Sequence, residues 1–306
     1  MPSASEIREQ VAEESRRRER LAVPAFAGGF LYLLSAIIIS STLSALPKVG
    51  LLQGLAPAFS GVAQPTVSPR APEVEFISHR AFALIVGSAL AAVAIGALLL
   101  ILLLLDDATR FRRPKSLAAA RPLIVFGGVA VVIVTVGHQV VSAIETHRFA
   151  VGHDHSNHAV DQALTESTAN VVLSYIALLA GLALAVGMIA TMVNALRVGL
   201  LPRWMGVLGI FTGLLIVLPI GGAELQVVPA LWMVMMGILL VGRWPKEDPP
   251  AWAAGEARPW PSQAQLRAAR QGDGTPAVAA VGAGSTPAPT PPSTPPSSRK
   301  RRRKRG

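Results

Sequence analysis

The sequence predicts an all-α membrane protein: a six-helix transmembrane bundle followed by a disordered C-terminal tail. Of its 306 residues, 51% are hydrophobic and only 15% are charged, with a mean hydropathy of +0.48. A water-soluble core does not need so much apolar sequence. The charged residues are also gathered in short blocks, at Arg16–Arg18, Arg110–Lys115 and Arg299–Arg305, between long uncharged stretches. This segregation points to a lipid bilayer.

The apolar stretches have the length that a membrane requires. A helix needs about 20 mostly apolar residues to cross roughly 30 Å of hydrocarbon, because it rises about 1.5 Å per residue. The six candidate spans are residues 21–46, 81–105, 122–144, 169–196, 204–220 and 227–242. The first is expected to be retained, because it is longer than a signal-peptide core of roughly 7–15 residues. The last two lie at the lower limit of length.

The distribution of Lys and Arg predicts the orientation of these spans. With the N-terminus inside, the inner segments before the tail hold twelve such residues (five, five and two), whereas the outer connections hold four. Positive charge is retained on the cytoplasmic side. We therefore expect a multi-pass membrane protein with both termini in the cytoplasm.

The segments outside the spans differ in character. Residues 1–20 begin with Ser3 and Glu6 in a capping-box arrangement and predict a short cytoplasmic surface helix that leads into span one. The first outer connection, about 47–80, is rich in Pro and Gly and predicts an irregular cap, while the second, about 145–168, is the most polar stretch between the ends. Long connections carry function more often than tight turns do.

Small residues at helical spacing predict where the helices meet. Close backbone approach replaces the hydrophobic effect between helices in a bilayer. The predicted seams are Ser88, Ala92 and Gly96 in the second span, Ala177, Gly181 and Ala185 in the fourth, and Gly206, Gly209 and Gly213 in the fifth. They indicate a bundle and not a function.

Histidines gather at the outer end of spans three and four. Five of the six lie between residues 138 and 158. Imidazole and carboxylate are common ligands of transition metals, so a divalent metal is one interpretation of this cluster. The candidate ligands are His147, His153, His155 and His158. A solvated polar loop and a pH-sensing loop are the alternatives, because the spacing matches no established closed metal site.

A stripe of polar residues continues from this cluster into the membrane. Its members on span three are Thr135, His138, Gln139, Ser142 and Glu145, and those on span four are Asn170 and Ser174. Ionisable groups within a span suggest a functional site. One interpretation is a structural clasp with His138 bonded to Asn170 or Ser174. Another is a hydrated vestibule for a small solute or ion.

The C-terminal tail, residues 244–306, is predicted to be disordered. It contains half of all the prolines together with many Ala, Gly, Ser and Thr residues, and this composition cannot bury enough apolar surface to fold. Its end carries seven consecutive cations: Arg299, Lys300, Arg301, Arg302, Arg303, Lys304 and Arg305. Each is worth about 1 kcal/mol beside an anionic leaflet, so lipid headgroups are the expected partner. RNA or another polyanion is an alternative, without specific nucleic-acid recognition.

One segment carries a family resemblance. Residues 200–242 open with Leu201-Pro202-Arg203-Trp204-Met205-Gly206, a step into a short glycine-bearing span. This step resembles one in uncharacterised multi-pass membrane proteins, common in actinobacteria, that form a family of unknown function. The resemblance implies residence in a bacterial plasma membrane and no particular site.

No catalytic motif is present in the sequence, which also contains no cysteine and so no thiolate metal site or cysteine nucleophile. We therefore expect an accessory or interaction component of the membrane, without catalytic activity or cofactor and with other membrane proteins as candidate partners. A small transporter, or a metal or pH sensor that uses the outer patch, is the alternative, and a membrane enzyme comes third.

Overall fold

The computed structural model describes residues 3–47, 49–50, 59, 67–114, 119–217, 226–244, 248–260 and 267. In these ranges the chain is helical and contains no strand. The helices are α1 (Ala4–Ser44), α3 (Ala71–Arg112), α4 (Ala120–Val151), α5 (Asn157–Asp161), the π-helix η1 (Gln162–Glu166), α6 (Thr168–Val198), α7 (Arg203–Val217), α8 (Val227–Leu240) and α9 (Pro250–Ala254). All of them belong to one compact unit, residues 1–260, and residues 261–306 form a second unit.

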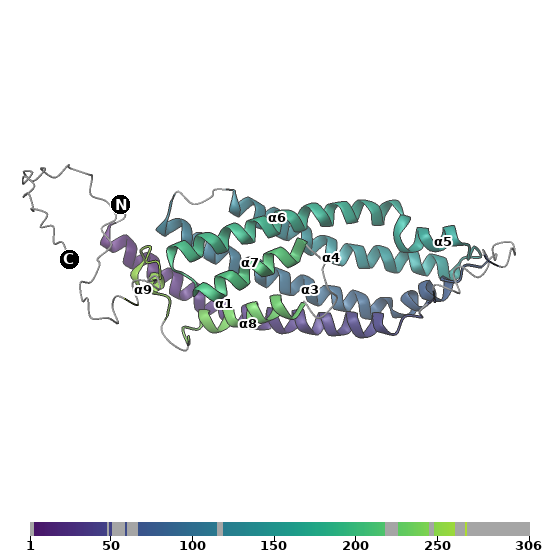
Figure 1. Ribbon diagram of the computed structural model, residues 1–306, viewed down its shortest axis with the longest axis horizontal. Helices are drawn as coiled ribbons and strands as arrows, with labels where there is room; N and C mark the ends of the chain where they lie inside the picture. The colour runs from purple at the N-terminus through teal and green to yellow at the C-terminus, as the bar shows by residue number, and fades with distance from the viewer. Residues whose placement is uncertain are drawn as a thin grey trace, which may run out of the picture. The chain divides into compact units, whose positions relative to one another are not determined.

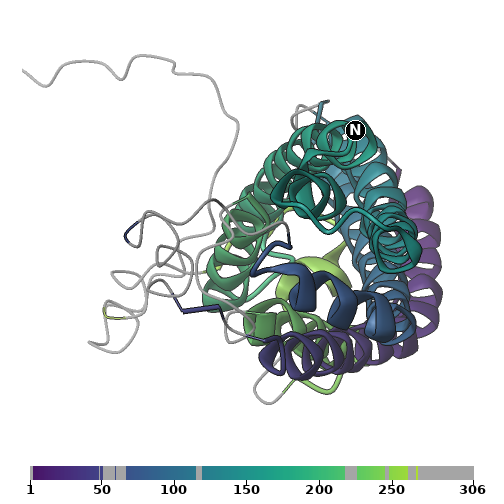
Figure 2. The same cartoon turned by 90° about the vertical axis from the view of Figure 1, so that its right-hand side faces the viewer.

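Within the described residues, four helical segments are long and apolar enough to cross a membrane: α1, α3, α4 and residues 157–198, which end in α6. They lie side by side in Figure 1. The helices pack in a closed order, α1 on α3, α3 on α4, α4 on α6, α6 on α7, α7 on α8 and α8 on α1. Figure 2 shows this arrangement from one end. The prediction of an all-helical protein is confirmed for the described residues.

Two of the six predicted spans correspond to shorter helices. Spans five and six coincide with α7 and α8, which are 15 and 14 residues long. The predicted turn between them, residues 218–225, lies outside the described residues.

The long helices extend beyond the predicted spans, and two expectations are corrected. Residues 4–20 are helical, begin with the predicted capping box and lead into span one without a break, as α1. Residues 71–80 belong to α3 and not to an irregular cap. The second outer connection is mostly helical, because α4 continues to Val151 and is followed by α5 and η1. Packing between these segments stabilises helices that composition alone did not predict.

Glycine seams bring α4 and α7 against α6. Gly206, Gly209 and Gly213 of α7 all face α6, so this predicted seam is confirmed. A Cβ on Gly127 of α4 would lie 2.5 Å from the backbone nitrogen of Leu184. In contrast, a Cβ on Gly96 would meet no atom within 4 Å, so the predicted α3 seam does not extend to that residue.

Candidate functional site

The predicted polar stripe on α4 lies partly buried in the outer part of the bundle. Thr135 donates its hydroxyl hydrogen bond to the carbonyl of Val131 at 2.7 Å. Thr146, one turn beyond Ser142, is fully buried and donates to the Ser142 carbonyl at 2.8 Å. These hydroxyls are therefore satisfied by their own helix. His138, Gln139, Ser142 and Glu145 are each partly exposed.

Asn170 is the polar residue of α6 that the structure buries most fully at this end. Its backbone N–H donates to Oγ of Ser167 at 3.2 Å, while its side chain is 2% exposed and both its polar atoms lack a hydrogen-bond partner among the described residues. The predicted bond from His138 to Asn170 is therefore not made. An unsatisfied buried amide costs about 1–3 kcal/mol. Ser174, one turn further along α6, is exposed.

The candidate metal ligands are not brought together. His147, His153 and His158 are exposed, and no three His, Cys, Asp or Glu residues in the described ranges are grouped as a metal ion would require. His155 instead packs its ring edge-on against Phe149, with the ring centroids 4.9 Å apart. In the same turn, the Ser156 backbone N–H donates to Asp154 at 2.9 Å, and this hydrogen bond lowers the pKa of the Asp154 carboxyl.

The outer connections form a packed cap. An apolar cluster joins the start of α3 to the end of α4, α5 and η1; its members are Ala71, Val74, Phe149, Val160 and Ala163. Arg70 spans the same segments, with ion pairs to Glu73 at 3.1 Å and Asp161 at 3.3 Å. Ser68 donates its backbone N–H to the His155 carbonyl at 2.7 Å. The histidine-bearing stretch is thus held against α3.

The segment 248–260 is ordered and packs on the end of the bundle that carries the start of α1. Trp252 of α9 is 3% exposed and donates its indole N–H to the Leu200 carbonyl at 2.9 Å. Trp260 donates to the Leu201 carbonyl at 2.9 Å. The prediction of disorder from residue 244 is therefore wrong for residues 248–260, because two tryptophans bury apolar surface that the average composition of the tail conceals. Residues 261–306 lie outside the described residues, apart from Arg267.

A buried ion pair lies beneath this segment. Arg112 of α3 binds both carboxylate oxygens of Glu14 of α1, at 2.8 and 2.7 Å, and the two side chains are 0% and 4% exposed. Arg112 also donates to the Ala251 carbonyl at 3.1 Å, and the guanidinium of Arg18 lies 4.7 Å from the Trp252 ring centroid. Such a pair is costly to break, since either partner alone would be an uncompensated buried charge.

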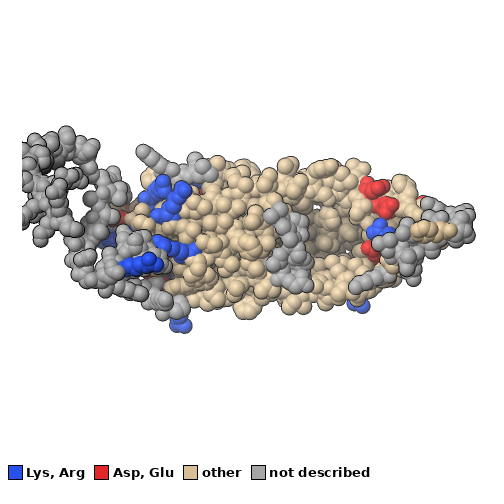
Figure 3. Space-filling model, viewed as in Figure 1, with Lys and Arg blue, Asp and Glu red and all other residues tan. Residues whose placement is uncertain are grey.

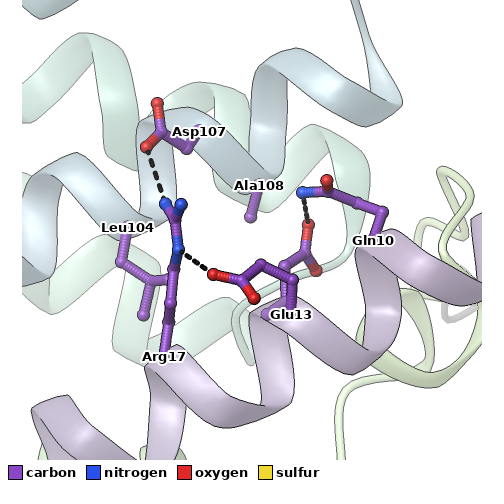
Figure 4. A pocket seen from close by; sticks show the side chains of 7 residues that line it. Gln10, Glu13, Arg17, Leu104, Asp107 and Ala108 are labelled. Carbon is purple, nitrogen blue, oxygen red and sulfur yellow. Dashed lines mark hydrogen bonds and ion pairs between the residues drawn. The ribbon is translucent and has the colours of Figure 1, made fainter.

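A pocket of about 240 Å³ opens beside this ion pair, between α1 and α3. It is lined by Gln10, Glu13, Glu14, Arg17, Leu104, Asp107 and Ala108 (Figure 4). Arg17 bridges its two walls, at 3.0 Å from Glu13 and 3.5 Å from Asp107. Each acidic residue that lines the pocket is already paired with an arginine. These ion pairs join α1 to α3, and the lining offers no unpaired carboxylate to a ligand.

Sequence reasoning missed this junction, although one signal was present. Tryptophan is rare in a Pro- and Ala-rich tail, so Trp252 and Trp260 mark a segment able to bury surface. The pairing of Glu14 with Arg112 had no such signal, because neither residue differs in sequence context from its charged neighbours.

Figure 3 shows a broad band without charged residues on this face, between one end where Lys and Arg gather and another where Asp and Glu are found together with further Lys or Arg. Together with the four helices of the described part that are long and apolar enough to cross a membrane, this pattern is that of a helical protein of the membrane type. Comparison of the chain with protein-family models, with curated proteins and with solved structures finds no match in any of the three.

Proposed function

We propose that this is a multi-pass protein of the bacterial plasma membrane that acts as an accessory or interaction component, without catalysis, and holds a basic tail at the cytoplasmic surface. The observation that carries the proposal is the packing of residues 248–260. Trp252 and Trp260 donate hydrogen bonds to carbonyls in the turn between α6 and α7, and these bonds hold residues 248–260 at that end of the bundle. The rest of the tail follows this segment directly in the chain.

The orientation follows from charge. Arg112 donates to the Ala251 carbonyl and Arg18 lies over the Trp252 ring, so both arginines lie at the end that carries the packed segment. In the sequence, twelve Lys and Arg residues are counted on that side against four on the other. Retention of positive charge in the cytoplasm places both termini inside.

The topology is tested with reporter fusions in the full chain. We expect a fusion at Gly152 to report the outer side and a fusion at Gly272 to report the cytoplasm, because an odd number of crossings separates them. The readout is paired phosphatase and fluorescent-protein activity in intact cells. Equal signals at both positions, on one common side, would overturn the orientation and the tail proposal together.

The tail is expected to bind anionic lipid. The protein contains no cysteine, so a dye attached to a Gly306→Cys variant reports the tail alone. In nanodiscs we expect the dye to approach the headgroups when anionic lipid is present and to withdraw as salt rises, because screening shortens the reach of each charge. Energy transfer from the dye to a headgroup acceptor measures this approach.

Two variants make the lipid test specific. Replacing all seven cations of Arg299–Arg305 by Gln should abolish the transfer, whereas replacing the five arginines by Lys should preserve it because the charge is retained. Transfer that is equal in neutral and anionic nanodiscs contradicts lipid binding. Binding of RNA by the tail in neutral nanodiscs would assign a different polyanion.

A second candidate function is a small transporter or a metal or pH sensor at the outer end. The unpartnered amide of Asn170 beneath the histidine-bearing cap favours it. Metal binding would require residues 153–158 to rearrange, since their side chains are not grouped in this structure. If the sensor uses a metal, purified protein should contain metal that a variant with Ala at His153, His155 and His158 lacks; equal, near-zero contents would exclude that form.

A further inference from the structure

The five tryptophans of the chain fall into two groups according to what accepts their indole N–H. Trp232, Trp252 and Trp260 each donate to a backbone carbonyl, at 3.1, 2.9 and 2.9 Å. Trp204 and Trp244 donate no such bond to any residue that the structure describes. An indole N–H is a donor that finds an acceptor in folded proteins. The acceptor of these two therefore lies outside the described chain.

Trp204 and Trp244 stack on each other where α7 begins and α8 ends, two helices that pack side by side in Figure 1. Their ring centroids are 5.8 Å apart and the ring planes meet at 26°. Gly242, with a φ of 73°, turns the chain after α8 and brings Trp244 back toward α7. Trp204 is 51% exposed and Trp244 is half-buried, so the stacked pair presents aromatic surface to its surroundings.

The pair ends an exposed apolar stripe on α7. Val207, Phe211 and Leu214 follow Trp204 at spacings of three and four residues, and all three are exposed. Exposed apolar side chains along one face of a membrane-type helix face the lipid chains. Arg203 comes immediately before Trp204, so the stripe changes from apolar to cationic within one residue. An indole at such a boundary is typical of the headgroup level of a bilayer.

Two arginines flank the stacked pair. Arg243 precedes Trp244, is exposed and forms no ion pair within the described part of the chain. A guanidinium binds phosphate oxygens through two parallel N–H bonds. Arg203, at the start of α7, donates to the Trp260 carbonyl at 3.2 Å, so the end of the packed segment 248–260 lies at the same level as the pair.

We propose that Trp204, Trp244 and Arg243 form a binding site for a phospholipid headgroup in the leaflet next to segment 248–260. The two indole N–H groups donate to ester and phosphate oxygens, Arg243 binds the phosphate, and the apolar stripe below Trp204 contacts the acyl chain. The inference rests on the membrane residence stated in the proposed function. It does not depend on the polybasic end of the tail or on which side of the membrane the termini lie.

Fluorine NMR of the full chain in nanodiscs tests where the pair lies. 5-Fluorotryptophan gives one resonance for each tryptophan, and Trp204→Phe and Trp244→Phe assign two of them while keeping an aromatic ring at each position. Relaxation is measured with a nitroxide on the lipid headgroup, a nitroxide at the end of the acyl chain, or a soluble nitroxide. Trp232 and Trp252, which are 0% and 3% exposed, are the internal controls.

We expect the headgroup nitroxide to relax Trp204 and Trp244 at least about threefold more than the acyl-chain or soluble nitroxide does, because indoles at the headgroup level lie nearest to it. Phe211→Trp provides a deeper reference on the same stripe. It lies seven residues along α7, about 10 Å below Trp204, and should respond mainly to the acyl-chain nitroxide.

The two references separate the possible failures. If Phe211→Trp responds mainly to the soluble nitroxide, the chain does not reside in the membrane and the proposed function fails with this inference. If Phe211→Trp lies in the hydrocarbon but Trp204 and Trp244 respond mainly to the soluble or acyl-chain nitroxide, the headgroup site alone is refuted. A pair that responds to none of the three is covered by protein, a second copy included, and this outcome also refutes the site.

Binding of the headgroup is measured by native mass spectrometry of detergent-purified protein with added phospholipid. A triple variant with Trp204→Phe, Trp244→Phe and Arg243→Gln should bind phospholipid at least about threefold more weakly than the parent, because it loses both indole donors and the guanidinium. Arg258→Gln, which removes another exposed arginine at the same end, should leave the affinity unchanged. Equal affinities of the triple variant and the parent would overturn the site.

Discussion

Replacing Glu14 by Gln should lower the free energy of unfolding by about 3–5 kcal/mol, because it leaves the charge of Arg112 buried without a counter-charge. Arg112 is 0% exposed and binds both oxygens of this carboxylate. The segment 248–260 should loosen as well, since Arg112 also holds the Ala251 carbonyl. Thermal unfolding in nanodiscs, with limited proteolysis after Trp244, measures both effects.

Glu13→Gln is the matched control. Glu13 lies beside Glu14 on α1, but its side chain is 43% exposed and its partners are surface arginines, so solvent screens the pairs and the expected loss of stability is far smaller than for Glu14→Gln. A double variant, Glu14→Leu with Arg112→Met, should recover much of the stability because it removes both buried charges together. Equal effects of Glu14→Gln and Glu13→Gln would show that the buried pair does not stabilise this junction.

Replacing Gly127 by Ala should destabilise the contact between α4 and α6 by about 1–3 kcal/mol, because overpacking forces the two backbones apart. The added Cβ would lie 2.5 Å from the Leu184 nitrogen and 3.0 Å from the Ala180 oxygen. These are backbone atoms, so no side-chain rotation can relieve the clash. The free energy of unfolding and the yield of folded protein after membrane extraction measure the effect.

Gly96→Ala is the control for this substitution. It adds the same methyl group to a long apolar helix, but no heavy atom lies within 4 Å of its Cβ position. Its expected effect is neutral or a gain of about 0.5–1 kcal/mol from the higher helix propensity of Ala. If the two variants lose stability equally, then close packing at Gly127 is not what joins α4 to α6.

The polar stripe at the outer end of α4 and α6 was predicted from the sequence only in part. Helical spacing predicted that Thr135, His138 and Ser142 share one face, since the period of a helix is a local property. It did not predict that the amide of Asn170 would be left without a partner. That outcome depends on the level of α6 relative to α4, which is set by the contacts of Gly127 and Gly137 with α6.

The tail illustrates the opposite case. Its average composition predicted disorder, and the average was misleading for residues 248–260. Two indole groups and the backbone of Arg258, whose N–H donates to the Val198 carbonyl at 2.9 Å, dock this segment on the turn between α6 and α7. The carbonyls that accept these hydrogen bonds belong to the end of α6 and the turn after it, so the composition of the tail alone could not predict them.

The sequence by itself determined that the chain is helical and suited to a membrane, because run length, apolar content and the segregation of charge are properties of single segments. Only the tertiary structure decided that Glu14 meets Arg112, that residues 248–260 are bound, and that Gly127 of α4 packs on the backbone of α6. Each of these depends on which helix faces meet and at what height along the bundle. These contacts join segments that are distant in the chain, so no local sequence pattern predicts them.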